Sequence, residues 1–123
     1  SHINKALKNI GDHLVNKGCF LFDFNSHRLF KEKHKGTFDR EFECFKFQQI
    51  CEYNTKTRIG KTIFDFGDIG KEVHIQKGYF YEEIKELLQK NNFNIITIFN
   101  GYDFKEVKKT DETLEKIIIL AQK

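Results

Sequence analysis

Methionine and proline are absent from this sequence, and cysteine occurs only three times. Because there is no methionine, we expect that the chain does not begin at a natural start codon; the lack of proline has no physical account. An odd number of cysteines without a Cys-x-x-Cys spacing argues against both a disulfide framework and a zinc site. We therefore expect free thiols in a reducing compartment, the cytoplasm, at Cys19, Cys44 and Cys51.

Long apolar runs, strong charge and metal-ligand spacings are also lacking. No run approaches the roughly 20 apolar residues of a membrane span, and no signal peptide is visible. The 21 basic and 18 acidic residues leave a net charge of +3, too small to indicate a nucleic-acid surface by itself. The five histidines show no metal spacing, so we expect no metal site.

What the sequence does have is enough apolar material for one domain with a real core. It is 39% hydrophobic over 123 residues, and 14 of these residues are Phe. An apolar stripe at helical spacing predicts an amphipathic helix near the N-terminus, formed by Ile3, Leu7, Ile10 and Leu14.

An almost entirely apolar run at 19–24 follows, typical of a strand that is buried on both faces in a parallel sheet covered by helices. Asn25 and Ser26 can cap a short helix over 27–34.

The C-terminal third repeats this style. Phe80, Ile84, Leu87 and Leu88 share one helical stripe, and Asn91-Asn92 can close that helix in the left-handed conformation. Strands are predicted at 93–99 and 115–122. Because the polar loop between them holds no helix, these two strands can form an antiparallel hairpin.

The middle of the chain has strand-like patterning instead. Segment 41–53 alternates near period two with one slip, which we interpret as a bulge. Two further strands are predicted within 56–66 and 71–79, with turns between them. The sequence therefore predicts an antiparallel meander of three strands.

The order of these elements, together with three segments, resembles the C-terminal half of a class I S-adenosylmethionine-dependent methyltransferase. The match is to bacterial small-molecule members with a meander inserted between the fifth strand and the next long helix. The segments are LKNIGDHLVNKGCFLFDFNS, HIQKGYFYEEIKELLQKNNFNIITIF and TLEKIIILAQK.

The resemblance implies an α/β fold, a partial Rossmann-like sheet of the last three strands with an inserted meander. Residues 1–36 would hold the first helix, the fifth strand and the short helix. Residues 37–79 would form the meander, and residues 80–123 the last helix and strand pair.

The family's cofactor-binding features have no counterpart in this sequence. In the family, an acidic residue with a Gly-x-Gly turn after the first strand, and an acid after the second, hold S-adenosyl-L-methionine. The turn Gly67-Asp68-Ile69-Gly70 follows no parallel strand-to-helix step, so we interpret it as a loop. The resemblance then implies a fragment that lacks the N-terminal cofactor-binding half. The fragment alone would be inactive, and the cofactor would bind in the full-length parent.

A missing half has a consequence for the sheet. The family's strand order places the strands at 19–24, 115–122 and 93–99 side by side in that order. The first of them has then lost a neighbour and presents an unpaired, uncharged edge. We expect the fragment to self-associate through this edge, as a dimer.

Four residues are candidates for binding the acceptor, a small molecule by resemblance. Asp23 and Asn25 lie at or just after the carboxyl end of a strand, where open α/β sheets bind ligands; ordinary capping and loop polarity explains them equally well. His74 and Tyr79 form the family's His-x4-Tyr pair, in a segment that closes over the active site. Tyr79 can hydrogen-bond an acceptor and His74 can assist proton removal, although we favour a structural role for His74.

For Ser26 and His27 we favour plain capping and loop polarity. No catalytic residue can be assigned.

Two other functions stay open. The stretch KGYFYEE at 77–83 superficially resembles the aromatic core of an RNA-recognition motif. Its aromatics, however, run straight into a predicted helix, so nucleic-acid binding is not expected. The other alternative is an independent α+β ligand-binding module without catalysis.

Overall fold

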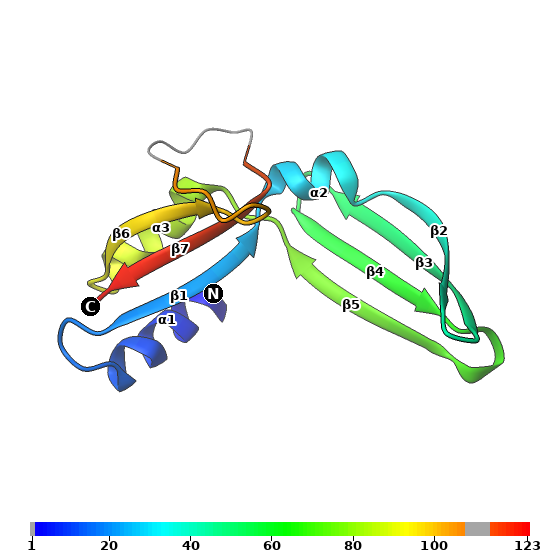
Figure 1. Cartoon of the computed structure of the whole chain (residues 1–123), viewed down its shortest axis with the longest axis horizontal. Helices are drawn as coiled ribbons and strands as arrows, with labels where there is room; N and C mark the ends of the chain where they lie inside the picture. Colours follow the sequence, from blue (N-terminus) through cyan, green and yellow to red (C-terminus); the bar gives the residue numbers. More distant parts are fainter. Residues whose placement is uncertain (1, 108–113) are drawn as a thin grey trace. The chain divides into compact units, whose positions relative to one another are not determined.

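The computed structural model describes residues 2–107 and 114–123, so Ser1 and part of the last predicted loop lie outside the described residues. The chain divides into two units (Figure 1). The first consists of Ser1–Ser26 and Tyr79–Lys123, and the second of His27–Gly78. The predicted boundaries grouped the short helix with the N-terminal segment, whereas the structure places it in the unit of the meander.

A three-stranded antiparallel sheet organises the first unit. Its strands are β1 (Cys19–Asn25), β7 (Lys116–Gln122) and β6 (Asn94–Asn100), in that spatial order. This order confirms the predicted one. The central strand is β7, where Ile119 lies opposite Phe22 of β1 on one side and Ile98 of β6 on the other.

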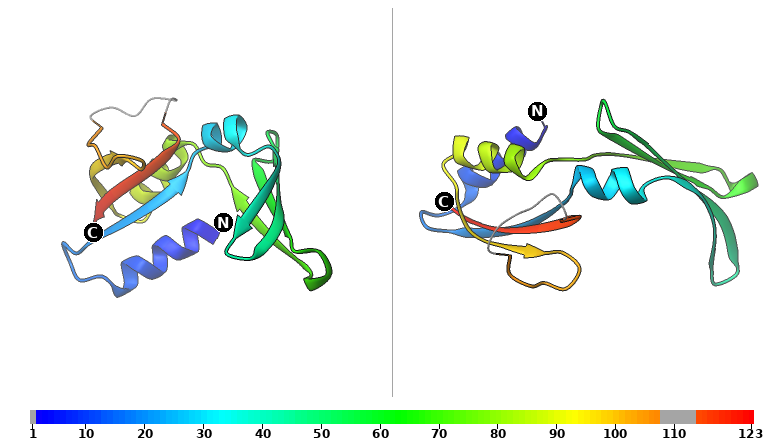
Figure 2. Two further views of the ribbon diagram at one scale, coloured as in Figure 1. Left: turned by 45° about the vertical axis from the view of Figure 1, so that its right-hand side comes forward. Right: turned by 90° about the horizontal axis from the view of Figure 1, so that it is seen from above.

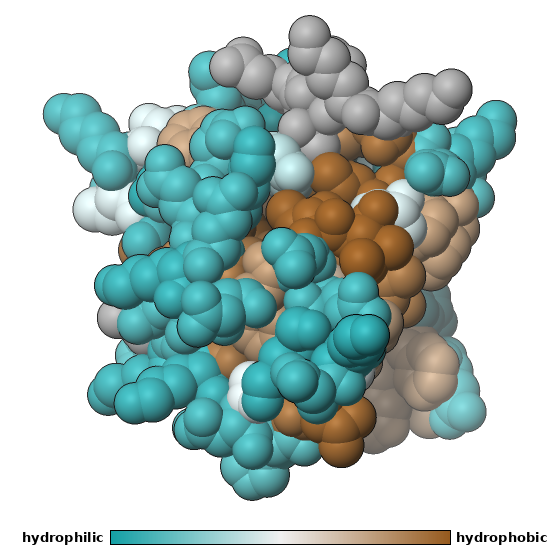
Figure 3. All heavy atoms as spheres, turned by 90° about the vertical axis from the view of Figure 1, so that its left-hand side faces the viewer, coloured by the Kyte–Doolittle hydropathy of each residue, from teal (hydrophilic) through white to brown (hydrophobic). Residues whose placement is uncertain are grey.

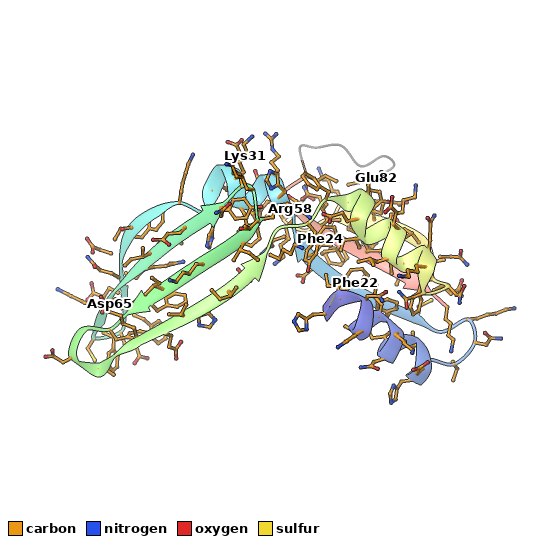
Figure 4. All side chains as sticks on the ribbon, turned by 180° about the vertical axis from the view of Figure 1, so that it is seen from behind. Phe22, Phe24, Lys31, Arg58, Asp65 and Glu82 are labelled. Atoms are coloured by element: carbon orange, nitrogen blue, oxygen red, sulfur yellow. The ribbon has the colours of Figure 1, made fainter. Side chains whose placement is uncertain are left out.

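Helices α1 (His2–His13) and α3 (Tyr81–Lys90) both cover the same face of this sheet (Figure 2). Phe22 and Phe24 of β1 lie on that face, toward the helices (Figure 4). Burying one such apolar side chain is worth about 1.5–3 kcal/mol. The core that results comprises Leu7, Ile84, Leu88, Phe93, Ile117, Ile119 and Ala121.

The expectation that β1 is buried on both faces is wrong. Its residues alternate between exposed and half-buried positions, and Leu21 is 53% exposed. Both helices lie on one face, and β1 stands at the edge of the sheet, so half of its apolar side chains meet no cover within the described residues. Seen from the left-hand side of Figure 1, the surface carries hydrophobic residues among hydrophilic ones (Figure 3).

The ends of α3 follow the sequence signals. The Phe80 backbone N–H donates to the Glu83 carboxylate at 2.9 Å, which closes the first turn. Asn92 takes a φ of 63° just after the helix, confirming the predicted left-handed end.

A four-stranded antiparallel sheet forms most of the second unit, with β2 (Gly36–Phe42), β3 (Phe45–Asn54), β4 (Ile59–Asp65) and β5 (Lys71–Lys77) in sequence order. The sequence predicted three strands in this sheet, and the structure has four, so that prediction is wrong. The slip in 41–53 is a tight hairpin: Phe42 pairs with Phe45, and Glu43 between them has a φ of 54°. A two-residue turn shifts the period-two pattern much as a bulge does, so the pattern alone does not separate them.

Helix α2 (His27–Lys33) matches the predicted short helix and packs on one end of this sheet. Phe30 is 2% exposed and stacks on Tyr53, with ring centroids 5.2 Å apart. Gly60 of β4 makes the close approach possible, because a Cβ there would lie 2.9 Å from the Phe30 ring. The 3-10 turn η1 (Gly67–Ile69) connects β4 to β5 at the other end of the sheet.

Candidate functional site

The chain leaves the first unit at the carboxyl end of β1 and returns to it at Tyr79, beside that strand end. Ser26 and Tyr79 form a parallel bridge, and the Tyr79 N–H donates to the Asn25 carbonyl at 3.4 Å. The Ser26 N–H donates to the Glu115 carbonyl and its hydroxyl to the Leu114 carbonyl, both at 2.8 Å. Ser26 is 6% exposed. Three segments far apart in sequence thus converge at this strand end, the expected place for a ligand in an open α/β sheet.

Two of the four candidates, Asn25 and Tyr79, meet here. The Asn25 side chain is half-buried and has no hydrogen-bond partner among the described residues. Its amide therefore offers both a donor and an acceptor at the strand end. The Tyr79 ring is half-buried and packs against the core of the first unit, so its apolar part is structural.

Asp23 has a local partner. Its carboxylate lies 3.4 Å from the Lys116 Nζ, and both side chains are substantially exposed. An exposed pair of this kind contributes about 0–1 kcal/mol to stability. The strand alternation puts Asp23 on the face of the sheet that the helices leave open.

His74 belongs to the other unit, on the edge strand β5. Its Nε2 lies 3.3 Å from the Glu72 carboxylate, and its ring meets the Phe64 ring edge-on at 5.3 Å. The side chain is exposed. A strand histidine with a local partner fits the structural role that we favoured for it.

Sequence reasoning missed a hydrogen-bonded pair in the second unit. The His27 Nδ1 lies 2.6 Å from the Tyr53 hydroxyl. Gly78 leaves room for this phenol, because a Cβ on it would come within 2.6 Å of the hydroxyl oxygen. Tyr53 gave no signal, because it stands 26 residues from its partner in an ordinary strand pattern.

The surroundings of one phenol in the first unit shift its pKa. Burial, with a smaller effect from the nearby Glu82 carboxylate, raises the pKa of the Tyr81 phenol above its ordinary value of 10.0. No group of His, Cys, Asp and Glu among residues 2–107 and 114–123 is arranged to hold a metal ion. Within the same residues, no helix is long and apolar enough to cross a membrane.

Comparison with known proteins gives a structural likeness only. No protein-family model matches the sequence, and no curated protein matches it. An S-adenosylmethionine-dependent methyltransferase from Clostridium acetobutylicum superposes with a TM-score of 0.75 at 21% identity, over 98% of this chain and 50% of that chain.

The chain has the fold of half a class I methyltransferase. The CcbJ methyltransferase from Streptomyces caelestis gives a TM-score of 0.71 at 7% identity, over 96% of this chain and 48% of that one. CalS10 bound to S-adenosylmethionine is an amino pentose methyltransferase from Micromonospora echinaspora involved in calicheamicin biosynthesis. It gives a TM-score of 0.53 at 8% identity, over 98% of this chain and 50% of that one. The chain thus spans about half the length of each of these structures.

The half-methyltransferase fold also bears on the RNA-recognition alternative. Strand β5 ends at Lys77, and Tyr81 is already the first residue of α3. Aromatic residues that stack on RNA bases stand on a strand. The aromatics of KGYFYEE do not form such a platform.

Proposed function

We propose that the chain is the acceptor-side, C-terminal half of an S-adenosylmethionine-dependent methyltransferase that acts on a small molecule. The observation that carries the proposal is the superposition over 98% of this chain and half of a methyltransferase at a TM-score of 0.75. The convergence of Asn25, Ser26 and Tyr79 at a strand end supports it, because a ligand in this fold class binds there.

The residues of this chain do not fit the cofactor by themselves. The Gly67–Gly70 segment is a 3-10 turn between antiparallel strands, closed by a hydrogen bond from the Phe66 N–H to the Gly70 carbonyl. It presents no helix N-terminus and follows no parallel strand. We therefore assign S-adenosyl-L-methionine to the rest of the parent, where it supplies the methyl group.

The part that this chain plays is to hold the acceptor. We propose that the Asn25 amide and the Tyr79 side chain contact the acceptor and fix its orientation toward the methyl donor.

The two edges of the first sheet differ in a way that supports a missing neighbour. The outer edge of β6 is covered by its own chain: Phe99 pairs with Glu106, and the Val107 N–H donates to the Ile98 carbonyl at 2.8 Å. No described residue pairs with the outer edge of β1. We infer that the parent supplies a strand there and that a second copy does so in the isolated chain.

Free thiols suit a parent that works in a reducing cytoplasm. The three cysteines are unpaired, and Cys19 and Cys44 are exposed.

Calorimetric titration with S-adenosylmethionine tests the proposed function. We expect no saturable binding to the 123-residue chain and binding in the low micromolar range, about 1–10 µM, to the full-length parent. Saturable micromolar binding by the isolated chain would sink the half-methyltransferase assignment. A parallel titration with single-stranded RNA covers the alternative function, and we expect no binding.

A further inference from the structure

The charges of the second unit are distributed unevenly along its strands. Cys51, Thr62 and His74 lie opposite one another in the register and divide the sheet across its strands. On the side that includes both ends of the unit, residues 27–36, 51–62 and 74–78 hold eight basic and two acidic side chains. The remaining residues of the unit hold three basic and six acidic side chains. We call the two sides the basic end and the acidic end. The basic residues of the basic end are Arg28, Lys31, Lys33, Lys35, Lys56, Arg58, Lys61 and Lys77.

Most of this positive charge comes from two segments that packing brings together, α2 and the turn between β3 and β4. The Phe30 ring of α2 stacks on Tyr53, which lies just before that turn. The first residue of α2 is close to Gly78, because a Cβ on Gly78 would lie 3.1 Å from the His27 Cα. The Gly78 N–H in turn donates to the Arg58 carbonyl at 2.9 Å. Both segments therefore lie at the same end of the sheet.

The charges at this end are not neutralised by neighbouring carboxylates. Figure 4 shows Lys31 and Arg58 at one end of the unit and Asp65 at the other. Four of the basic side chains are exposed and form no ion pair within residues 2–107 and 114–123, namely Arg28, Lys31, Lys35 and Lys56. A cluster of uncompensated positive charge attracts anions and raises their local concentration.

Arg58 occupies a backbone conformation that disfavours it. Its φ is 60°, in the left-handed region where only glycine avoids a steric cost. Hydrogen bonds fix the turn around it: the Arg58 N–H donates to the Asn54 carbonyl at 2.7 Å, and the Lys56 and Thr57 N–H groups donate to the Asn54 side chain. The Arg58 Nη1 lies 3.5 Å from the Gly78 carbonyl oxygen. Since glycine would suit this turn better, we infer that the guanidinium has a use besides the turn.

The basic end is linked to the candidate acceptor site by two peptide bonds. Ser26 at the end of β1 is bonded to His27, so the Cα of Arg28 lies within about 7 Å of the Cα of Ser26. Gly78, whose carbonyl lies beside the Arg58 guanidinium, is bonded to Tyr79. Chain connectivity alone therefore keeps both arginines near the strand end where we propose that the acceptor binds.

We propose that the methyl acceptor carries an anionic group, a phosphate or a carboxylate, and that the basic end of the second unit binds this group. The proposal rests on the proposed function and names the class of substrate for the same site. Arginine and lysine side chains are the usual partners of phosphate and carboxylate oxygens. The negative charge of the acidic end repels an anion, so the field along the sheet directs it toward the basic end.

NMR titration of the isotope-labelled 123-residue chain with inorganic pyrophosphate, at constant ionic strength, tests the proposal. We expect saturable shifts of the amides of 28–35 and 54–58, with a Kd on the order of 1 mM, because a small anion makes only a few charged contacts. A parallel titration with citrate represents carboxylates. Saturable binding of either anion at these amides supports the proposal, and the anion that binds more tightly gives the class of the acceptor's anionic group.

Three variants separate the role of the charge from the stability of the fold. Arg58→Gly removes a charge but suits the left-handed φ, so we expect pyrophosphate binding to weaken by about threefold and the midpoint of urea denaturation to rise. Lys31→Gln, at an exposed residue of α2, should weaken binding by a similar factor with no change in the midpoint. Lys46→Gln is the matched control in the acidic end, about 25 Å along β3 from the turn and beyond the Debye length. We expect it to bind pyrophosphate within about 1.5-fold of the wild type.

Several results would overturn the proposal. They are the absence of saturable shifts with both anions, equal shifts at the two ends of the sheet, and equal weakening by Lys31→Gln and Lys46→Gln. A loss of stability in Arg58→Gly with unchanged anion binding would do the same, because it would assign Arg58 to the turn alone. Tighter binding of single-stranded RNA than of either small anion would replace the proposal by a nucleic-acid surface. Cofactor binding by the full-length parent is measured without any added anion, so a failure of the proposed function is seen separately.

Discussion

The two sheets of this chain are buried to different extents. In the first unit the central strand β7 has three consecutive buried residues, Ile117, Ile118 and Ile119, and two helices cover one face. In the second unit every residue of the edge strands β2 and β5 is exposed, and only one short helix packs on the sheet. The first sheet is therefore stabilised by its own hydrophobic core, whereas the second sheet leaves apolar side chains exposed.

This contrast predicts that the stability of the chain depends on the first unit. Ile119 is 0% exposed at the centre of the three strands. Replacing it by Ala removes buried methyl groups and leaves a cavity, so we expect Ile119→Ala to lower the free energy of unfolding by about 2–5 kcal/mol in urea denaturation. Val73→Ala on the exposed strand β5 is the control, expected within about 0.5 kcal/mol of the wild type. Equal losses in both variants would contradict the contrast.

A pair of glycine substitutions sharpens the same comparison. At Gly60 a Cβ would lie 2.9 Å from the Phe30 ring, so Gly60→Ala pushes α2 off its sheet and costs about 1–3 kcal/mol. At Gly11 in α1 a Cβ would meet the Phe93 ring at 3.4 Å, an ordinary contact. Gly11→Ala instead gains helix propensity, and we expect a stabilisation of up to about 1 kcal/mol. Urea denaturation should therefore show opposite signs; the same sign in both variants would be evidence against this packing.

A third change concerns the open side of the first sheet. Leu21 is 53% exposed on β1, whose outer edge no described residue covers. We expect Leu21→Lys to weaken self-association of the isolated chain by about tenfold in light scattering, because a charge on an edge strand opposes edge-to-edge pairing. Val15→Lys, at an exposed residue between α1 and β1, is the control and should not change association. Rapid exchange of amides 19–24 in a monodisperse monomer would contradict the edge pairing.

Much of the first unit could be predicted from sequence. Apolar spacing marks α1 and α3, and the resemblance supplied the order of β1, β7 and β6, which spacing alone does not give. The predictions that failed have physical causes. Whether Leu21 is buried depends on what covers β1, which lies outside its own local pattern. The hairpin at Glu43 was missed because a non-glycine residue takes a positive φ there, against its local preference.

The candidate site was predictable only in part. The meeting of Asn25 with Tyr79 follows from family likeness, since 54 positions separate them in sequence. The contact between His27 and Tyr53 depends on how α2 packs on β3, which no local signal reports. The sequence pattern favours an ordinary polar residue at the start of a helix for His27. The structure shows instead that its imidazole lies 2.6 Å from a phenol of the neighbouring sheet.

The smallest effect that we expect is a pH dependence of the free energy of unfolding, caused by Tyr81 in the first unit. Burial, and to a lesser extent Glu82, raises the pKa of Tyr81 in the folded chain above the 10.0 of an exposed phenol. The folded state then holds the phenolic proton more tightly than the unfolded state. Its contribution to stability is complete below about pH 10 and is lost as the pH rises through the folded-state pKa.

Urea denaturation between about pH 8 and pH 11 measures this loss. Tyr81→Phe cannot ionise, so its free energy of unfolding should fall less steeply above about pH 10 than that of the wild type. Absorbance titration at alkaline pH gives an independent reading, because Tyr81→Phe should remove a late-ionising phenol. If the slopes of the two proteins coincide, burial of Tyr81 does not influence stability.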